Sequence, residues 1–275
     1  MDSVKGDRAP DPEELLALAL QVARPAAELA SSMRGRGVDQ VATKSTDTDI
    51  VTAADQAVER QVRAAFAEAR PGDVVLGEEF GGGAPAGRSA VRWILDPIDG
   101  TVNYLYDIPQ YAVSLAAEVD GRVVAGVVLN AATGEEWTAT LGGGAHLAGR
   151  RLTGSVQTRL GQALVGTGFG YDAARRAHQA RVVAGLITEV RDIRRFGSAA
   201  LDLCLAATGR IDAYFEKGLQ EWDLAAGGLI ATEAGLLVTG LEGAAPGADL
   251  VLAAPPALHE ALHAHLVKLD AAGGP

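Results

Sequence analysis

The amino-acid sequence predicts a mixed fold in which an α+β half over about residues 12–150 is followed by an α/β half over about residues 151–270. The first half has two helical patterns and then a run of strands joined by tight turns, which is the element order of an α+β arrangement. The second half alternates strands and helices, as an α/β layer does. Because no repeat or low-complexity linker separates the halves, we predict a single domain over residues 1–275.

Two helices are predicted at the start of the first half. Residues 12–33 follow an Asp-Pro-Glu-Glu start, and their apolar side chains recur at helical spacing. Residues 52–70 form the second helix, which the following Pro-Gly pair ends. Thr52 can cap this helix together with Asp55, three residues on, in a variant of the capping box. Capping alone explains Asp55, although a capping carboxylate can also face a functional site.

Two apolar strands of the first half both end in carboxylates. Residues 74–80 end in Glu78 and Glu79, and the next apolar run ends in Asp96 and Asp99. Carboxylates at the mouth of a buried strand are costly unless a cation neutralises them. If the two strands lie side by side and run the same way, the four side chains converge. Because no set of His and Cys side chains converges with them, the sequence favours Mg²⁺ or Mn²⁺ over Zn²⁺.

The strands that complete the first half form an antiparallel meander over residues 111–119, 122–130 and 135–140, joined by Asp-Gly and Thr-Gly turns. Residues 142–146 are glycine-rich and predict a further turn. In the second half, strands are predicted near residues 163–167, 190–195, 211–216, 236–238 and 249–254. Helices are predicted between the first two of these strands, through about 189, and over residues 197–208, 221–233 and 256–269.

Two helix starts in the second half carry candidate functional groups. Gly197-Ser198-Ala199-Ala200 opens one helix and offers free backbone N–H groups to a hydroxyl or an anion. Asp223 lies in the first turn of the helix over residues 221–233, where the helix dipole stabilises a carboxylate. Glu216 ends the strand before it.

Composition limits the partners. A net charge of −11 and a pI near 4.9 argue against binding nucleic acid or an anionic membrane surface, and no run approaches the roughly 18 apolar residues of a membrane span. A small phosphorylated substrate remains compatible, because a bound metal inverts the local field. The single cysteine, Cys204, excludes a disulfide within the chain and predicts a reducing cytoplasm.

Three motifs resemble the signatures of the inositol monophosphatase family. They are Gly77-Glu78-Glu79, the Asp-Pro-Ile-Asp-Gly-Thr run at 96–101, and the Trp-Asp-Leu-Ala-Ala-Gly run at 222–227. Residues 44–55 resemble the mobile loop of that family, and residues 197–200 resemble its substrate loop. The resemblance covers roughly residues 15–270 and is strongest to the bacterial inositol-1-monophosphatases. Val102 and Tyr104 depart from the commoner family residues, and neither is an expected ligand.

The resemblance implies a layered αβαβα sandwich of the inositol monophosphatase and fructose bisphosphatase type, a homodimer, and Mg²⁺-dependent, lithium-sensitive hydrolysis of a phosphomonoester. It implies two or three Mg²⁺ ions per site, for which Mn²⁺ can substitute. The expected ligands of the first ion are Glu78, Asp96 and the carbonyl of Ile98. The expected ligands of the second ion are Asp96, Asp99 and Asp223, so Asp96 is expected to bridge the two ions. The expected positioning residues of the attacking water are Glu78, Thr101 and Asp55. The expected substrate contacts are Asp99, Gly100, Thr101, Gly197, Ser198, Ala199 and Glu216.

Lys44 has two interpretations. From its spacing alone it is a solvated loop lysine. From the resemblance, its loop closes over the site and helps to hold a third, loosely bound metal near Glu78 and Glu79.

The residues themselves favour direct attack by water. Metal ions neutralise a phosphate dianion and lower the pKa of water, and no nucleophilic Ser–His or Cys–His pair is evident in the sequence. The first hypothesis for the substrate is inositol 1-phosphate, with histidinol phosphate or fructose 1,6-bisphosphate as alternatives on the same fold. A non-catalytic regulatory or RNA-associated protein that keeps the fold is the alternative from another class.

Overall fold

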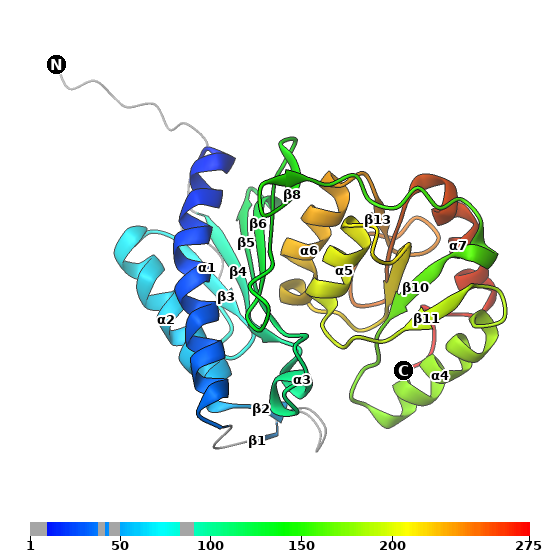
Figure 1. Ribbon diagram of the computed structural model, residues 1–275, viewed down its shortest axis with the longest axis horizontal. Coiled ribbons are helices and arrows are strands. Elements are labelled where there is room, and N and C mark those ends of the chain that lie inside the picture. Colours follow the sequence, from blue (N-terminus) through cyan, green and yellow to red (C-terminus); the bar gives the residue numbers. More distant parts are fainter. Residues whose placement is uncertain (1–9, 38–41, 44–49, 83–90) are drawn as a thin grey trace.

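Five layers build the molecule, alternating helices and sheets (Figure 1). The computed structural model describes residues 10–37, 42–43, 50–82 and 91–275. An outer pair of helices covers a seven-stranded sheet, a central pair separates this sheet from a five-stranded one, and a second outer pair closes the far side. In the same order across the molecule these pairs are α1 (Pro12–Gly35) with α2 (Ala53–Ala69), α5 (Ala199–Ala207) with α6 (Glu221–Glu233), and α4 (Ala173–Leu186) with α7 (Pro256–Lys268). The predicted αβαβα layering is therefore confirmed.

The larger sheet has the strand order β3-β4-β5-β6-β7-β8-β9. Its strands are β3 (Val74–Gly77), β4 (Arg92–Asp99), β5 (Ala112–Val119), β6 (Arg122–Asn130), β7 (Glu136–Thr140), β8 (Gly144–Leu147) and β9 (Arg150–Arg151). Only β3 and β4 run parallel, which is the pairing that brings their acidic ends together. Both faces of the sheet are buried: Trp93 stacks on Phe66 of α2, and Ile94, the next residue, packs in the cluster that contains α6.

Two local predictions in this half were wrong, and one helix was missed. β3 ends at Gly77, and residues 78–80 form a turn, because the backbone groups of Gly77 and Gly81 bond to each other and fold the chain back. Residues 144–147 form a strand rather than only a turn, because they pair with β7. A five-residue helix, α3 (Thr101–Leu105), follows β4 and was not predicted.

The smaller sheet has the strand order β11-β10-β12-β14-β13. Its strands are β10 (Leu164–Thr167), β11 (Asp192–Arg194), β12 (Ala213–Glu216), β13 (Leu237–Thr239) and β14 (Val251–Ala254), with a short 3₁₀ turn, η1 (Leu160–Gln162), before β10. Because β10 and β12 are parallel neighbours, their last residues, Thr167 and Glu216, lie at the same edge of the sheet. A separate two-stranded pairing joins β1 (Ala42–Thr43) to β2 (Ile50–Val51). No helix within the described ranges is long and apolar enough to cross a membrane.

Candidate active site

A cavity of about 430 Å³ lies where strand ends of both sheets and the first turns of α3, α5 and α6 come together. Carboxylates from both halves of the chain line it. They are Glu78, Asp96, Asp99, Asp172, Glu216 and Asp223. The predicted convergence of the β3 and β4 ends, through Glu78 and the two aspartates of β4, is therefore observed.

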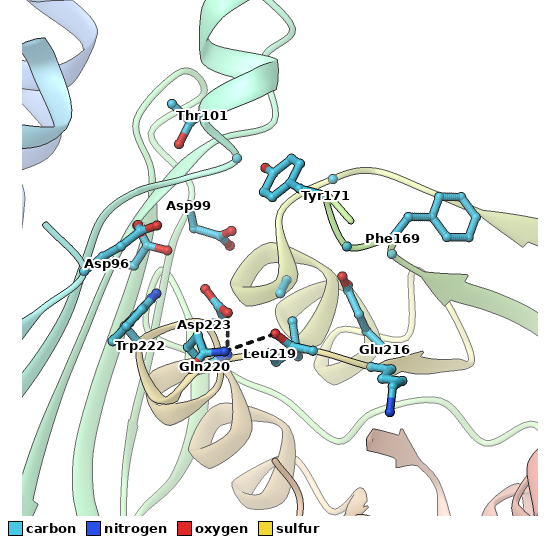
Figure 2. A pocket seen from close by; sticks show the side chains of 18 of the residues that line it. Asp96, Asp99, Thr101, Phe169, Tyr171, Glu216, Leu219, Gln220, Trp222 and Asp223 are labelled. Carbon is cyan, nitrogen blue, oxygen red and sulfur yellow. Dashed lines mark hydrogen bonds between the residues drawn. The ribbon is translucent and has the colours of Figure 1, made fainter. Parts of the chain in front are cut away.

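Three of these carboxylates form the acidic end of the cavity. Asp96, Asp99 and Asp223 each offer an oxygen within 4.8 Å of the others. Figure 2 shows the three side chains around one common space, with Asp223 reaching it from α6 and the two other aspartates from β4. Asp96 and Asp99 are almost completely buried. The donor set consists of carboxylate oxygens, which suits a hard divalent cation.

The electrostatics of this end also suit a cation. Burial, followed by repulsion from the neighbouring carboxylates, raises the pKa of Asp96 well above its usual range. The pKa of Asp223 is raised well above its usual range for the same two reasons, and the Gln220 backbone amide, 2.7 Å from its Oδ2, opposes the shift. Three ionised carboxylates at such short separations repel one another strongly. A bound divalent cation would remove that repulsion and favour the ionised form of each group.

Asp99 is held by the N-terminus of α5. Its Oδ2 accepts hydrogen bonds from the Ser198 hydroxyl at 2.6 Å and the Ala200 backbone N–H at 2.7 Å. Burial raises the pKa of Asp99 to about 6, while these bonds and the Ala199 amide act in the opposite direction. Ser198 is also the N-cap of α5, so its hydroxyl and the first turn of the helix serve to orient Asp99. Ala199 and Gly197 line the cavity itself.

Asp55 caps α2 and also contacts Thr101. Its Oδ2 accepts the Thr52 backbone N–H at 2.8 Å, which completes the predicted capping box of α2. Its Oδ1 lies 3.3 Å from the Thr101 hydroxyl, which also lies 3.1 Å from the Ile98 carbonyl oxygen. Thr101 lines the cavity, whereas Asp55 is fully buried behind it.

The turn between β4 and α3 fixes the main-chain groups of the site. The Ile98 N–H donates to Asp96 Oδ1 at 3.0 Å, so the backbone orients this carboxylate. Gly100 adopts φ 96°, and a Cβ there would lie 2.8 Å from the Gln110 carbonyl oxygen. Only glycine fits this position without strain. Ile98 and Gly100 both line the cavity.

Glu216 lies on the opposite wall, separated from the three aspartates by open cavity (Figure 2). Its Oε2 accepts a hydrogen bond from the Tyr214 hydroxyl at 2.5 Å, and desolvation raises its pKa to about 7. Gly168 provides the space for it, because a Cβ at residue 168 would lie 1.9 Å from Glu216 Oε2. The carboxylate is therefore confined from two sides.

Sequence reasoning missed several residues that line the cavity, on both walls. The additional lining residues with large or charged side chains include Phe169, Tyr171, Arg175, Arg195, Gln220 and Trp222. One signal pointed to the first two, because they follow β10, and the ends of parallel neighbours such as β10 and β12 meet at one edge. Arg195 lies two residues before the loop over residues 197–200 but carries no pattern of its own.

Two candidate residues for a third metal site, Glu79 and Lys44, do not line the described cavity or lie outside the described residues. Glu79 follows Glu78 on the turn but is not among the described residues that line the cavity. Its backbone N–H donates to Glu59 at 2.8 Å. Lys44 lies outside the described residues, so its predicted role at a third metal stays a prediction.

Comparison with known proteins agrees with this geometry. Residues 11–271 match the model of the inositol monophosphatase family. The chain is 46% identical to the inositol-1-monophosphatase of Mycobacterium leprae, over 94% of this chain and 96% of that protein. It is 40% identical to the Nus factor SuhB of Pseudomonas aeruginosa, over 84% of this chain and 87% of that protein. The solved structure of Mycobacterium tuberculosis SuhB aligns with a TM-score of 0.81 at 42% identity, over 96% of this chain and 99% of that one.

The match spans nearly the whole chain, and it includes all three motifs that supply the acidic end of the cavity. On these grounds the chain belongs to the inositol monophosphatase family.

Proposed function

We propose that this protein is a Mg²⁺-dependent phosphoric monoester hydrolase that converts inositol 1-phosphate to inositol and phosphate. The observation that carries the proposal is the convergence of Asp96, Asp99 and Asp223 at one end of a cavity whose other end presents Glu216. The acidic end suits metal ions and the phosphate they attract, and the opposite carboxylate suits the hydroxyls of a polyol. The name of the mycobacterial relative supports the same substrate.

In this proposal five residues hold two Mg²⁺ ions, for which Mn²⁺ can substitute. They are Glu78, Asp96, the carbonyl of Ile98, Asp99 and Asp223. When bound there, the metal neutralises the phosphate dianion and lowers the pKa of the attacking water. Asp96 would help to hold both ions, and the Ile98 amide keeps its Oδ1 in place. Lithium sensitivity, and a third ion held with the help of Lys44 and Glu79, belong to the same proposal.

The attacking water is positioned by the Thr101 hydroxyl. Thr101 has one proton, which it donates to Asp55 or to the Ile98 carbonyl, since both oxygens are within reach. Its lone pairs therefore face outward as acceptors, and a water in the cavity donates to them. Glu78 accepts the proton that the water loses on attack. The leaving oxygen of the substrate takes a proton from solvent.

The leaving group occupies the space between Asp99 and Glu216. Both carboxylates accept hydrogen bonds from ring hydroxyls, and the Gly100-Thr101 and Gly197-Ser198-Ala199 segments contribute backbone donors to the phosphate and the ring. Histidinol phosphate and fructose 1,6-bisphosphate remain the alternative substrates. Because the acidic end itself combines Asp96 and Asp99 from the first half of the chain with Asp223 from the second, we further propose that residues 1–275 act as one phosphatase domain, as a cytoplasmic homodimer.

A kinetic panel tests the substrate. Initial rates of phosphate release are measured with Mg²⁺ on inositol 1-phosphate, histidinol phosphate and fructose 1,6-bisphosphate. The highest kcat/KM is expected for inositol 1-phosphate, because it presents the most hydroxyls to Glu216 and Asp99. A higher kcat/KM for histidinol phosphate would overturn the inositol assignment while leaving the reaction class intact.

A second candidate function is favoured by the relatives named Nus factor SuhB, at 36–40% identity. A role in a transcription complex would replace or accompany hydrolysis. The net charge of −11 weighs against direct contact with RNA, but not against contact with a protein of that complex. If the wild type hydrolyses the phosphomonoester and Asp96→Asn does not, the protein is an enzyme. If the wild type is inactive but binds transcription proteins, the alternative is favoured.

A further inference from the structure

Glu59 is a fully buried carboxylate that the proposed chemistry does not use. It lies in α2, four residues after Asp55, and none of its side chain is exposed. Glutamate is almost never buried to this extent unless it is paired. Its Oε2 accepts the Glu79 backbone N–H at 2.8 Å, and its Oε1 accepts the Phe80 backbone N–H at 3.2 Å. The carboxylate therefore binds the turn that directly follows Glu78.

Arg63 completes a clamp around this turn. Its Nε donates to Glu59 Oε1 at 2.8 Å, and its Nη2 donates to the Gly81 carbonyl. The turn is closed by reciprocal backbone bonds, from Gly77 N–H to the Gly81 oxygen at 3.1 Å and from Gly81 N–H to the Gly77 oxygen at 3.0 Å. A Cβ at residue 77 would lie 2.1 Å from Glu59 Oε1, so the glycine allows the carboxylate to approach.

Helix α2 thus carries two buried acids on one face. Residues four apart in an α-helix are neighbours on the same side, one turn apart. Asp55 contacts Thr101 at the end of β4, and Glu59 contacts the turn that bears Glu78 at the end of β3. Both contacts are made from one rigid element. The spacing between Thr101 and Glu78 is consequently set by α2 as well as by the β3–β4 pairing.

We propose that Glu59 is a positioning residue that holds the Glu78 turn against the cavity and thereby sets the metal affinity of the site. The inference rests on the proposed function, in which Glu78 is a ligand. Glu59 acts through the backbone of residues 79 and 80 and touches neither metal nor substrate. Partners that orient metal ligands from behind commonly change metal affinity by about tenfold to a hundredfold when they are replaced.

Glu59→Gln is the informative substitution because it conserves size while removing one acceptor. An amide has a single acceptor oxygen, whereas the carboxylate accepts from two backbone N–H groups and from Arg63. In either rotamer the new NH₂ group faces another donor. Glu68→Gln is the matched control, since Glu68 is an exposed glutamate on the same helix.

The test measures metal binding without turnover. Sensitised Tb³⁺ luminescence, followed by competition with Mg²⁺, is recorded for the wild type, Glu59→Gln, Glu68→Gln and Asp96→Asn, together with amide hydrogen exchange over residues 77–81. We expect Glu59→Gln to weaken Mg²⁺ binding about tenfold and to speed exchange at the Glu79 and Phe80 amides, with Glu68→Gln unchanged. Wild-type affinity and exchange in folded Glu59→Gln would overturn the inference.

Two further outcomes separate this inference from the proposed function. If Asp96→Asn binds metal as tightly as the wild type, the proposed set of metal ligands is incorrect, independently of the result for Glu59→Gln. If Glu59→Gln does not fold, Arg63→Gln takes its place, because Arg63 is partly exposed and its loss removes the donor that holds both Glu59 Oε1 and the Gly81 carbonyl of the turn. We expect a smaller weakening of Mg²⁺ binding in that variant, and an unchanged affinity there contradicts the inference.

Discussion

The two ends of the cavity are built in different ways. At the acidic end, Asp99 is fixed by two hydrogen bonds from α5, Asp96 by the Ile98 amide, and Asp223 by the Gln220 amide. At the opposite end, Glu216 accepts a hydrogen bond from the Tyr214 hydroxyl, and its neighbours come from the loop after β10. In the proposed function the acidic end carries the chemistry, and the opposite end selects the leaving group. Substitutions at the two ends should therefore affect different kinetic constants.

The largest effect is expected at the shared ligand. Asp96→Asn should lower kcat for inositol 1-phosphate by roughly a thousandfold, because it removes several kcal/mol of charge stabilisation from both metals. Phosphate release under saturating Mg²⁺ measures it. Asp120→Asn is the matched control: Asp120 is exposed at a hairpin tip with φ 50°, a conformation that asparagine adopts readily. Undiminished activity in Asp96→Asn would contradict the proposed two-metal site.

The next effect concerns the water. Thr101→Ala should lower kcat by about a hundredfold and leave KM nearly unchanged, because the lost hydroxyl orients the nucleophile rather than the substrate. Thr101→Ser keeps the hydroxyl beside Asp55 and should retain most of the rate. Steady-state measurements of kcat and KM for both variants test this expectation. Equal losses in the alanine and serine variants would point to packing by the threonine methyl instead.

A smaller effect is expected at the opposite end. Tyr214→Phe deletes only the hydroxyl that fixes Glu216, and it should raise KM for inositol 1-phosphate about threefold to tenfold, the range of one hydrogen bond. Hydrolysis of p-nitrophenyl phosphate, whose leaving group has no ring hydroxyls, should stay as in the wild type. If Tyr214→Phe raises the KM for both substrates by the same factor, the two ends of the cavity do not have separate functions.

The smallest effect is on stability as a function of pH. The pKa of Asp99, at about 6, and that of Glu216, at about 7, lie above their ordinary values of 3.8 and 4.5. Between about pH 4 and pH 7 the metal-free native state therefore binds more protons than the unfolded chain, and its stability falls as the pH rises. Mg²⁺ binds the ionised carboxylates at the acidic end, so the increase in Tm that it causes should grow from pH 5 to pH 7.5.

Differential scanning calorimetry with and without Mg²⁺ measures this increase. Asp96→Asn, which lacks the shared ligand, provides the comparison and should show little dependence on Mg²⁺ at any pH. An equal Mg²⁺ effect at pH 5 and pH 7.5 in the wild type speaks against carboxylates that ionise as they bind metal.

The contrast between the two ends also explains what the sequence could predict. Short motifs with fixed backbone geometry, such as residues 96–101 and the Thr52–Asp55 cap, reveal themselves through residue type and spacing. Phe169, Tyr171 and Arg195 do not, because a loop side chain reaches a cavity only through the arrangement of distant strands. Glu59 was overlooked for another reason: a glutamate in an amphipathic helix resembles a solvated one until the turn it binds is known.

The central claim is that Asp96 joins the two halves of the chain around shared metal ions. Anomalous diffraction from a crystal soaked with Mn²⁺ and phosphate tests it most directly. The expected result is two peaks that share Asp96, one also beside Glu78 and the Ile98 carbonyl, and one also beside Asp99 and Asp223, with phosphate against both. Mn²⁺ peaks away from Asp96, or none in this cavity, would contradict the claim.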